Sequence, residues 1–285
     1  MAIQEGRPDL VLNSTSASLA TYRPQGLGWQ TAASLLLAAF GFLMLGDTAS
    51  ATRNAGEAVA TLNNIGDSWG LMHAQALLGG IAEAEGRFGD AAEALERAAD
   101  ESATLGFLGQ AALHRSSLGR VQQRAADPRA GTTYERAITE AVAGGDGRLA
   151  ATARLHLARL QRAAGNTDDA ATLLEENQQW YAAAGGGDFA LLNDAVLAAI
   201  RNDAARLGSL LAAARSVDNV EVQVYVLDAL ARLAAAEDRP AARALLAEAD
   251  QLATHVGHLL DQNDRYDART LRRLEESKSG PPRQD

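Results

Sequence analysis

Residue types that carry covalent chemistry are scarce in this chain of 285 residues. It has no cysteine, which excludes thiol nucleophiles, thiolate metal sites and disulfide bonds. Its one lysine is Lys278, so it lacks the lysine of a phosphate-binding loop, a Schiff base or a kinase. No Gly-x-Ser-x-Gly elbow of a hydrolase occurs either. We therefore predict that the chain is not an enzyme, and we expect no catalytic residue.

Two of the five histidines have a spacing that could serve a metal ion. His255 and His258 stand three residues apart on one face of a predicted helix, with Asp261 and Asp264 just beyond. Two imidazoles and a carboxylate could hold a metal there. We favour the alternative of partly exposed histidines near a helix end, because no HExxH or EF-hand sequence accompanies them. We expect neither a metal nor a cofactor.

Arginine supplies nearly all the positive charge, and its chemistry is that of binding. Guanidinium groups bind carboxylates or phosphates through two parallel hydrogen bonds, and they stack on aromatic rings. Four arginines, Arg120, Arg124, Arg159 and Arg162, fall in two neighbouring stretches of the sequence. Whether they act together depends on the elements that position them.

The composition favours helices as those elements. Apolar residues make up 47% of the chain but aromatic residues only 5%, and alanine is abundant, which suits close-packed helices better than sheets. The net charge of −10 opposes non-specific binding to nucleic acid or to anionic membranes. The N-terminus has no basic segment followed by an apolar run, as an export signal would. We therefore expect a cytoplasmic protein that binds neither nucleic acid nor membranes directly.

A repeat of about forty residues is visible in this composition. In the stretch LGGIAEAEGRFGDAAEALERA, small residues stand where the two helices of a tetratricopeptide unit approach each other, and Gly86 turns the corner between them. Similar patterns occur upstream and downstream, which gives five to six helical hairpins. The sequence thus predicts an all-α, tetratricopeptide-like, right-handed superhelical solenoid. The alternative is an irregular helical bundle in which alanine and glycine recur by composition alone.

The predicted domain organisation follows from the extent of the repeats. Residues 1–28 form an N-terminal extension that is partly helical or irregular. Residues 29–260 form the helical repeat domain. Residues 261–285 form a C-terminal tail, and we expect its last part to be disordered because it is polar and contains two prolines.

The stretch IGDSWGLMHAQALLGGIAEAEGRFGDAAEALERA resembles the repeats in the C-terminal arm of actinobacterial AfsR/SARP-type and MalT-like (LuxR-type) signal-transduction ATPase regulators. Gly66, Asp67, Trp69 and Gly70 match the start of such a repeat. The resemblance implies an arm that senses or docks in bacterial transcriptional control. The chain departs from these regulators in having no GKS/GKT loop for an ATPase and no basic helix-turn-helix segment.

In a tetratricopeptide stack, the first helix of each hairpin lines the concave groove. Counting from the Leu-Gly pairs, we predict a ligand-binding groove whose residues are His73, Glu83, Ser116, Arg120, Gln123, Arg124, Thr152, Arg159 and Arg162. Its four arginines would bind a peptide, a protein segment or a small acidic ligand. The alternative is an ordinary solvated face whose arginines pair with acidic neighbours.

The first predicted hairpin presents an apolar surface instead. Its candidate partner contacts are Leu36, Phe40, Leu43 and Met44. Terminal repeats usually have a polar outer face, so an apolar one predicts that something covers it. The candidates are the Leu10-Val11-Leu12 segment folding back, a second copy in a homodimer, or an upstream domain.

Together these features favour a non-enzymatic protein–protein interaction or sensor module of a bacterial transcriptional or signalling regulator. A homo-oligomerisation arm that uses the apolar N-terminal hairpin is the alternative. An enzyme with an unrecognised site in the groove is less favoured, since no nucleophile–base pair is visible.

Overall fold

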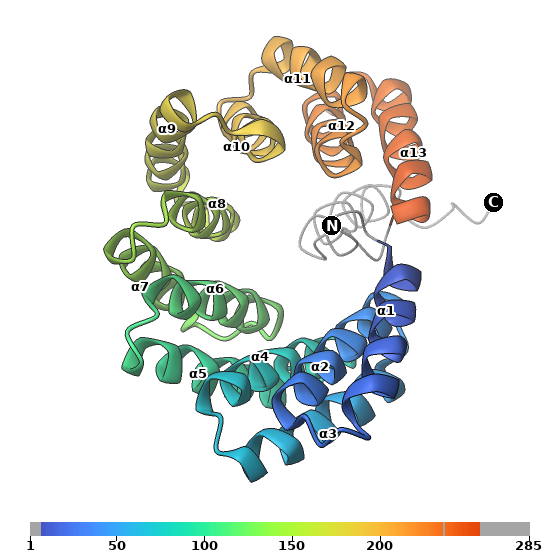
Figure 1. Ribbon diagram of the computed structural model, residues 1–285. Coiled ribbons are helices and arrows are strands. Elements are labelled where there is room, and N and C mark those ends of the chain that lie inside the picture. Colours follow the sequence, from blue (N-terminus) through green and yellow to red (C-terminus); the bar gives the residue numbers. More distant parts are fainter. Residues whose placement is uncertain (1–6, 236, 257–285) are drawn as a thin grey trace, which may run out of the picture. The chain divides into compact units, whose positions relative to one another are not determined.

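The computed structural model describes residues 7–235 and 237–256, and it leaves out the side chains of Asp188 and of residues 254–256. These described residues form thirteen helices and no strand (Figure 1). The helices are α1 (Pro8–Tyr22), α2 (Gly28–Met44), α3 (Thr48–Ile65), α4 (Ser68–Ala84), α5 (Phe88–Thr104), α6 (Leu108–Arg124), α7 (Ala130–Ala143), α8 (Gly147–Ala163), α9 (Thr167–Ala184), α10 (Gly187–Ile200), α11 (Ala204–Ser216), α12 (Val220–Ala234) and α13 (Arg239–Val256). The predicted all-α, tetratricopeptide-like solenoid is confirmed.

The chain divides into two compact units, the first ending at Ala153 and the second beginning at Arg154, within α8. In the first unit α2, α4 and α6 are the A helices of successive hairpins, and α3, α5 and α7 are their B partners. In the second unit α10 packs against α9 and α11, and α12 packs against α11 and α13. The predicted C-terminal tail, His255 and His258 lie outside the side chains that the structure describes.

Helix ends recur at a regular interval of twenty residues in the first unit. A residue with positive φ follows each of the helices α1 to α6, at positions 26, 46, 66, 86, 106 and 126. Gly86 is typical: its φ is 74°, and the N–H of the next residue, Arg87, donates to the Ala82 carbonyl oxygen at 2.8 Å. This bond satisfies a carbonyl that the helix end would otherwise leave unpaired. Ala126 is the one residue of this series that is not glycine, and it adopts the same conformation with a φ of 54°.

Small residues set the distance between the A and B helices. A Cβ atom added to Gly79 would lie 2.8 Å from Leu95 Cγ, and one added to Gly119 would lie 2.7 Å from the Tyr134 ring. These two glycines are forty residues apart, at the same position of successive repeats. A side chain at these positions would push the two helices of the hairpin apart. The small residues therefore allow the close helix packing that the sequence pattern predicted.

Helix α1 packs along α2 and covers part of its apolar surface. Val11 is buried, and a Cβ atom added to Gly41 would lie 3.1 Å from Leu12 Cδ2. The Leu10-Val11-Leu12 segment thus folds back onto the first hairpin, which was one of the three predicted coverings. The four candidate partner contacts, Leu36, Phe40, Leu43 and Met44, are each half-buried. Their role in binding a partner remains a prediction.

The core of the second unit is aliphatic, with one polar pair inside it. Leu174, Leu207 and Leu227 are fully buried. Asn193, which is also inaccessible to solvent, donates to the Leu174 carbonyl oxygen at 3.0 Å and accepts from the Asn177 amide at 3.1 Å. These bonds offset part of the cost of burying the two amides. Within residues 7–256, as far as they are described, no helix is long and apolar enough to cross a membrane.

Candidate functional site

Three of the predicted groove residues meet at one carboxylate oxygen in the first unit. Glu83 of α4 is only 5% exposed. Arg124 of α6 donates from Nη1 to its Oε1 at 2.7 Å, and Arg120, one turn earlier, donates from Nη1 to the same oxygen. The A helices of two successive hairpins are therefore joined by a buried carboxylate between two guanidinium groups, an arrangement that stabilises all three charges.

The two arginines differ in how much of their charge is available. The Arg124 side chain is 15% exposed, and its guanidinium carbon lies 4.8 Å from the centroid of the Phe88 ring, close enough for a cation–π interaction. The Arg120 side chain is 34% exposed. Apart from the bond to Glu83, no hydrogen bond of Arg120 occurs among the described residues. Its remaining N–H groups can therefore donate to a second carboxylate from outside the protein.

An aromatic cluster lies nearer the N-terminal ends of the same two helices. The His73 ring is 4.3 Å from the Trp69 ring and 6.3 Å from the His114 ring, each in an edge-on arrangement. The Nε2 atoms of both histidines are buried and have no hydrogen-bond partner among the described residues. Burial lowers the pKa of His73, although nearby Asp67 acts in the opposite direction. Burial, with a smaller contribution from His73, lowers the pKa of His114 to about 4.

Both imidazoles are thus neutral at pH 7, and neither adds positive charge to the arginine surface. Among the described residues, no group of three or more histidine, cysteine, aspartate or glutamate side chains could hold a metal ion. The cluster contributes an aromatic and uncharged part of the surface beside the charged one.

The other predicted groove residues of the first unit are less available. Ser116 is buried, and Gln123 accepts a hydrogen bond from the Tyr134 hydroxyl at 3.3 Å. The Thr152 hydroxyl donates to the Arg148 carbonyl oxygen at 3.0 Å, within its own helix. Of the predicted groove residues in this unit, the structure brings Glu83, Arg120 and Arg124 together. Their role in binding a ligand stays a prediction.

Arg159 and Arg162 belong to the second unit. Arg162 bonds to the Tyr225 hydroxyl, and its guanidinium carbon lies 5.8 Å from the centroid of that ring. Arg159 is half-buried on the same helix. The prediction that these two arginines share one groove with Arg120 and Arg124 stays a prediction.

Sequence reasoning missed the most deeply buried cation of the first unit. The Arg115 side chain is 3% exposed; its Nε donates to both Glu140 oxygens at 2.8 and 2.7 Å, and its Nη2 donates to Asp100 at 2.7 Å. Burial alone would lower the pKa of Arg115, but the two carboxylates outweigh burial and raise it. In the sequence, Glu140 follows Ala137 of the repeat by three residues. In the structure it lies on the turn of α7 that faces α6. Nothing in the sequence identifies Arg115 as the partner.

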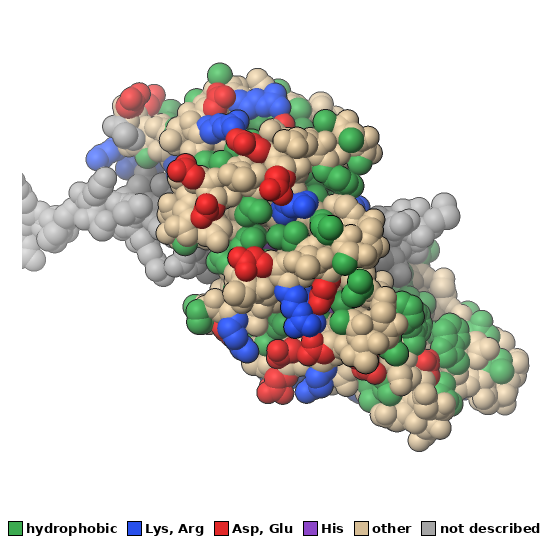
Figure 2. Space-filling model, turned by 90° about the vertical axis from the view of Figure 1, so that its left-hand side faces the viewer, with side chains coloured by type: hydrophobic (Ala, Val, Ile, Leu, Met, Phe, Trp, Pro, Cys, Tyr) green, Lys and Arg blue, Asp and Glu red, His purple; other side chains and the backbone are tan. Residues whose placement is uncertain are grey.

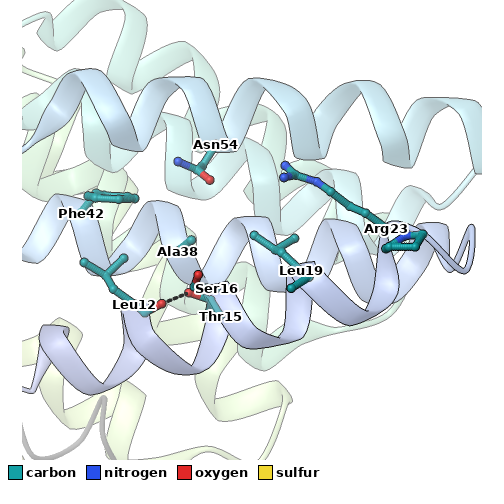
Figure 3. Close-up of a pocket in the computed structure, with 10 residues that line it drawn as sticks. Leu12, Thr15, Ser16, Leu19, Arg23, Ala38, Phe42 and Asn54 are labelled. Carbon is teal, nitrogen blue, oxygen red and sulfur yellow. Dashed lines mark hydrogen bonds between the residues drawn. The ribbon is translucent and has the colours of Figure 1, made fainter.

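A cavity of about 580 Å³ lies between α1, α2 and α3 (Figure 3). Its walls are mainly apolar, with Leu12 and Leu19 on α1 and Phe42 on α2. Three of the polar side chains that line it have partners: the Thr15 hydroxyl donates to the Leu12 carbonyl oxygen, the Asn54 amide to the Ser50 carbonyl oxygen, and Arg23 to Glu57. Few polar groups are then left to orient a specific ligand.

Charges of both signs alternate on the face that Figure 2 shows, where acidic side chains lie next to basic ones. The charges on this face are therefore not segregated by sign.

Comparison with known proteins identifies the fold but no family. Neither a family model nor a curated protein sequence matches the chain. Solved structures do match. A crystal structure of BtubC (BKLC) from P. vanneervenii is 18% identical, with a TM-score of 0.58, over 88% of this chain and 92% of that one.

Two further structures are similar over nearly the whole chain. A Rap protein complexed with competence and sporulation factor is 12% identical, with a TM-score of 0.65, over 97% of this chain and 72% of that one. PH0952 from Pyrococcus horikoshii, a signal-transduction ATPase with numerous domains and a tetratricopeptide repeat sensor, is 13% identical, with a TM-score of 0.64. That match covers 92% of this chain and 44% of PH0952. These likenesses establish a tetratricopeptide-like helical repeat fold.

Proposed function

We propose that the chain is a non-enzymatic interaction or sensor module that binds an acidic peptide or protein segment on the A-helix surface of its first unit. The observation that carries this proposal is the pair of arginines at Glu83. They hold a carboxylate already, and Arg120 still has unused donors at a partly exposed position. An aspartate or glutamate side chain of a ligand would dock on Arg120 while Glu83 keeps both guanidinium groups in place.

The aromatic cluster supports an extended ligand over an isolated ion. His73 is half-buried and lies along the same helix as Glu83, so one ligand can contact the ring and the arginines at Glu83. A peptide would supply an apolar contact at His73 and a charge at Arg120, and two such contacts give more affinity and specificity than either alone. A metal ion or a small inorganic anion would use only one part of this surface.

We also propose a setting for this activity, as part of a bacterial transcriptional or signalling regulator. The resemblance of residues 65–98 to the repeat arms of AfsR/SARP-type and MalT-like regulators supports it. So does the structural likeness to a protein with a tetratricopeptide repeat sensor. The ligand would then act as the signal that this arm detects.

Selection of ligands from a random peptide library displayed on phage tests the proposal. We expect the selected peptides to be acidic, and replacing their Asp and Glu by Asn and Gln should abolish binding. Arg120→Ala should weaken binding at least tenfold, since a hydrogen bond to a charged group contributes about 1.5–3 kcal/mol. The control is Arg97→Ala, because Arg97 is an exposed arginine on the B helix α5. Peptides that bind Arg120→Ala as tightly as the wild type would refute the proposal.

A further inference from the structure

Exposed large apolar side chains are concentrated at one kind of turn in this fold. Eight of the twelve such side chains among the described residues lie where a B helix, or α1, leads into the next A helix. Six of these eight belong to the first unit, and we refer to them as the apolar edge. Its members are Trp29, Ile65, Trp69, Leu105, Phe107 and Val142, with 44% to 57% of each exposed.

These six side chains lie on the same edge of the unit because neighbouring helices are antiparallel. The start of each A helix lies beside the end of its own B helix. In the first hairpin, a Cβ atom added to Gly28 would lie 3.2 Å from Ile65 Cγ2, and in the third, one added to Gly144 would lie 3.2 Å from Leu108 Cβ. Trp29 and Trp69 are forty residues apart, as are Ile65 and Leu105. The repeat therefore places equivalent apolar groups in a row along one edge of the stack.

The opposite edge of the same unit has a different character. There the turns from A to B helices carry ion pairs, in which Arg87 bonds Glu85 and Asp90, and Arg129 bonds Asp127. Leu45 is the one exposed large apolar residue in these A-to-B turns among those that the structure describes. Composition alone would make the two edges alike, so the difference marks the apolar edge as an interaction surface.

We infer that the apolar edge binds the same edge of a second copy of this chain, in an isologous dimer. A two-fold axis pairs the two rows in opposite directions, so that the tryptophans at one end of the row face Leu105 and Val142 at the other end. Indole rings then pack on aliphatic side chains, which is a favourable complement. No member of the edge is charged, so the two rows meet through uncharged side chains.

The size of the edge sets how much surface a dimer can bury. Its exposed side-chain area is on the order of 600 Å² per copy, near the upper end for an apolar patch on a monomer. Two copies would bury about 1,200 Å², the lower limit for a specific interface. Interfaces of this size are typical of weak complexes, so we expect a dimer that dissociates in the micromolar range. Added salt should strengthen it, because salt screens the repulsion between two acidic chains.

Sedimentation velocity of the full chain between about 1 and 200 μM, at low and high salt, tests this inference. We expect a monomer–dimer equilibrium that salt shifts toward the dimer. The double variant Leu105→Ser, Val142→Ser should weaken dimerisation at least tenfold. The control is Leu45→Ser. Leu45 is 58% exposed, close to the 57% of Val142, but it lies on the opposite edge, so this change should leave the dimer unchanged. Circular dichroism melting shows whether each variant is folded, and Ile65→Ser replaces the double variant if that one melts early.

A second readout comes from fluorescence. Two of the three tryptophans, Trp29 and Trp69, lie in the apolar edge, so their emission should shift to the blue as the concentration rises. A chain that stays monomeric at 200 μM would overturn the inference. So would a dimer that forms equally well in the folded edge variants, because it would then use another surface.

Discussion

Ala126 is the one alanine among the regularly spaced residues that end the helices of the first unit. Its φ of 54° places it in the left-handed region, where glycine stands at positions 26, 46, 66, 86 and 106. The capping geometry is nonetheless complete, since the Asp127 N–H donates to the Gln122 carbonyl oxygen at 2.8 Å. We predict that Ala126→Gly stabilises the protein.

The magnitude follows from two opposing effects. An L-residue in the left-handed region costs about 1–2 kcal/mol relative to glycine. The glycine variant gives back about 0.4–1 kcal/mol through the greater conformational entropy of its unfolded chain. Ala126 is exposed, so losing its methyl group removes no core contact. The net gain in the free energy of unfolding is then about 0.5–1 kcal/mol.

Urea unfolding followed by circular dichroism measures this gain. The midpoint should rise with an unchanged slope, and the melting temperature should rise by about 2–4 °C per kcal/mol for a unit of this size. The matched control is Gly86→Ala, which makes the reverse change one repeat earlier and should destabilise by about 1 kcal/mol. If Ala126→Gly is neutral or destabilising while Gly86→Ala is destabilising, the reasoning on the shared cap conformation is wrong.

Three further changes test the interior of the first unit. Arg115→Met should destabilise by about 3–5 kcal/mol because it leaves Glu140 buried without its main partner, and adding Glu140→Leu should restore much of that loss in the same urea assay. Lowering the pH from 6.5 to 4 should reduce the free energy of unfolding by up to about 3 kcal/mol through His114. The folded pKa of His114, about 4, lies below its unfolded value, so the unfolded chain binds the proton first. The variant His114→Gln should lose less stability over that pH range. Gly119→Ala should destabilise by about 1–3 kcal/mol by forcing a Cβ atom against the Tyr134 ring, and an unchanged melting temperature would show that the hairpin can widen freely.

The fold was predictable from the sequence because its determinants are local. Gly79 and Gly119 mark close helix contacts at a fixed place in each repeat, and Gly86 marks a turn. Such positions depend on backbone conformation and side-chain size, which can be assigned from residue type and spacing alone.

The candidate site was predictable only in part, since its geometry depends on contacts between repeats. Counting from the Leu-Gly pairs placed Glu83, Arg120 and Arg124 on adjacent A helices. It did not show that both arginines bind one oxygen, because side-chain rotamers decide that. Arg115 was missed for the same reason: whether an arginine faces solvent or an acidic pair depends on the helices packed around it.

The apolar edge was missed for another reason. Sequence patterns identify apolar residues, but the exposed fraction of Trp69 or Phe107 depends on where each helix ends relative to its neighbours. The sequence instead directed attention to Phe40 and Met44, which the structure shows to be half-buried. Their predicted role in contacting a partner and the inferred role of the apolar edge are separable by the variants described above.

The central claim is that a ligand binds on the A helices of the first unit. A photoreactive amino acid placed at position 76 tests it most directly, since Ala76 lies on α4 between His73 and Glu83 along one face of the helix. With an acidic peptide selected from the library, light should cross-link the peptide to position 76 and not to a control probe at position 97 on the B helix α5. Cross-linking from position 97 alone, or equally from both positions, would contradict the claim.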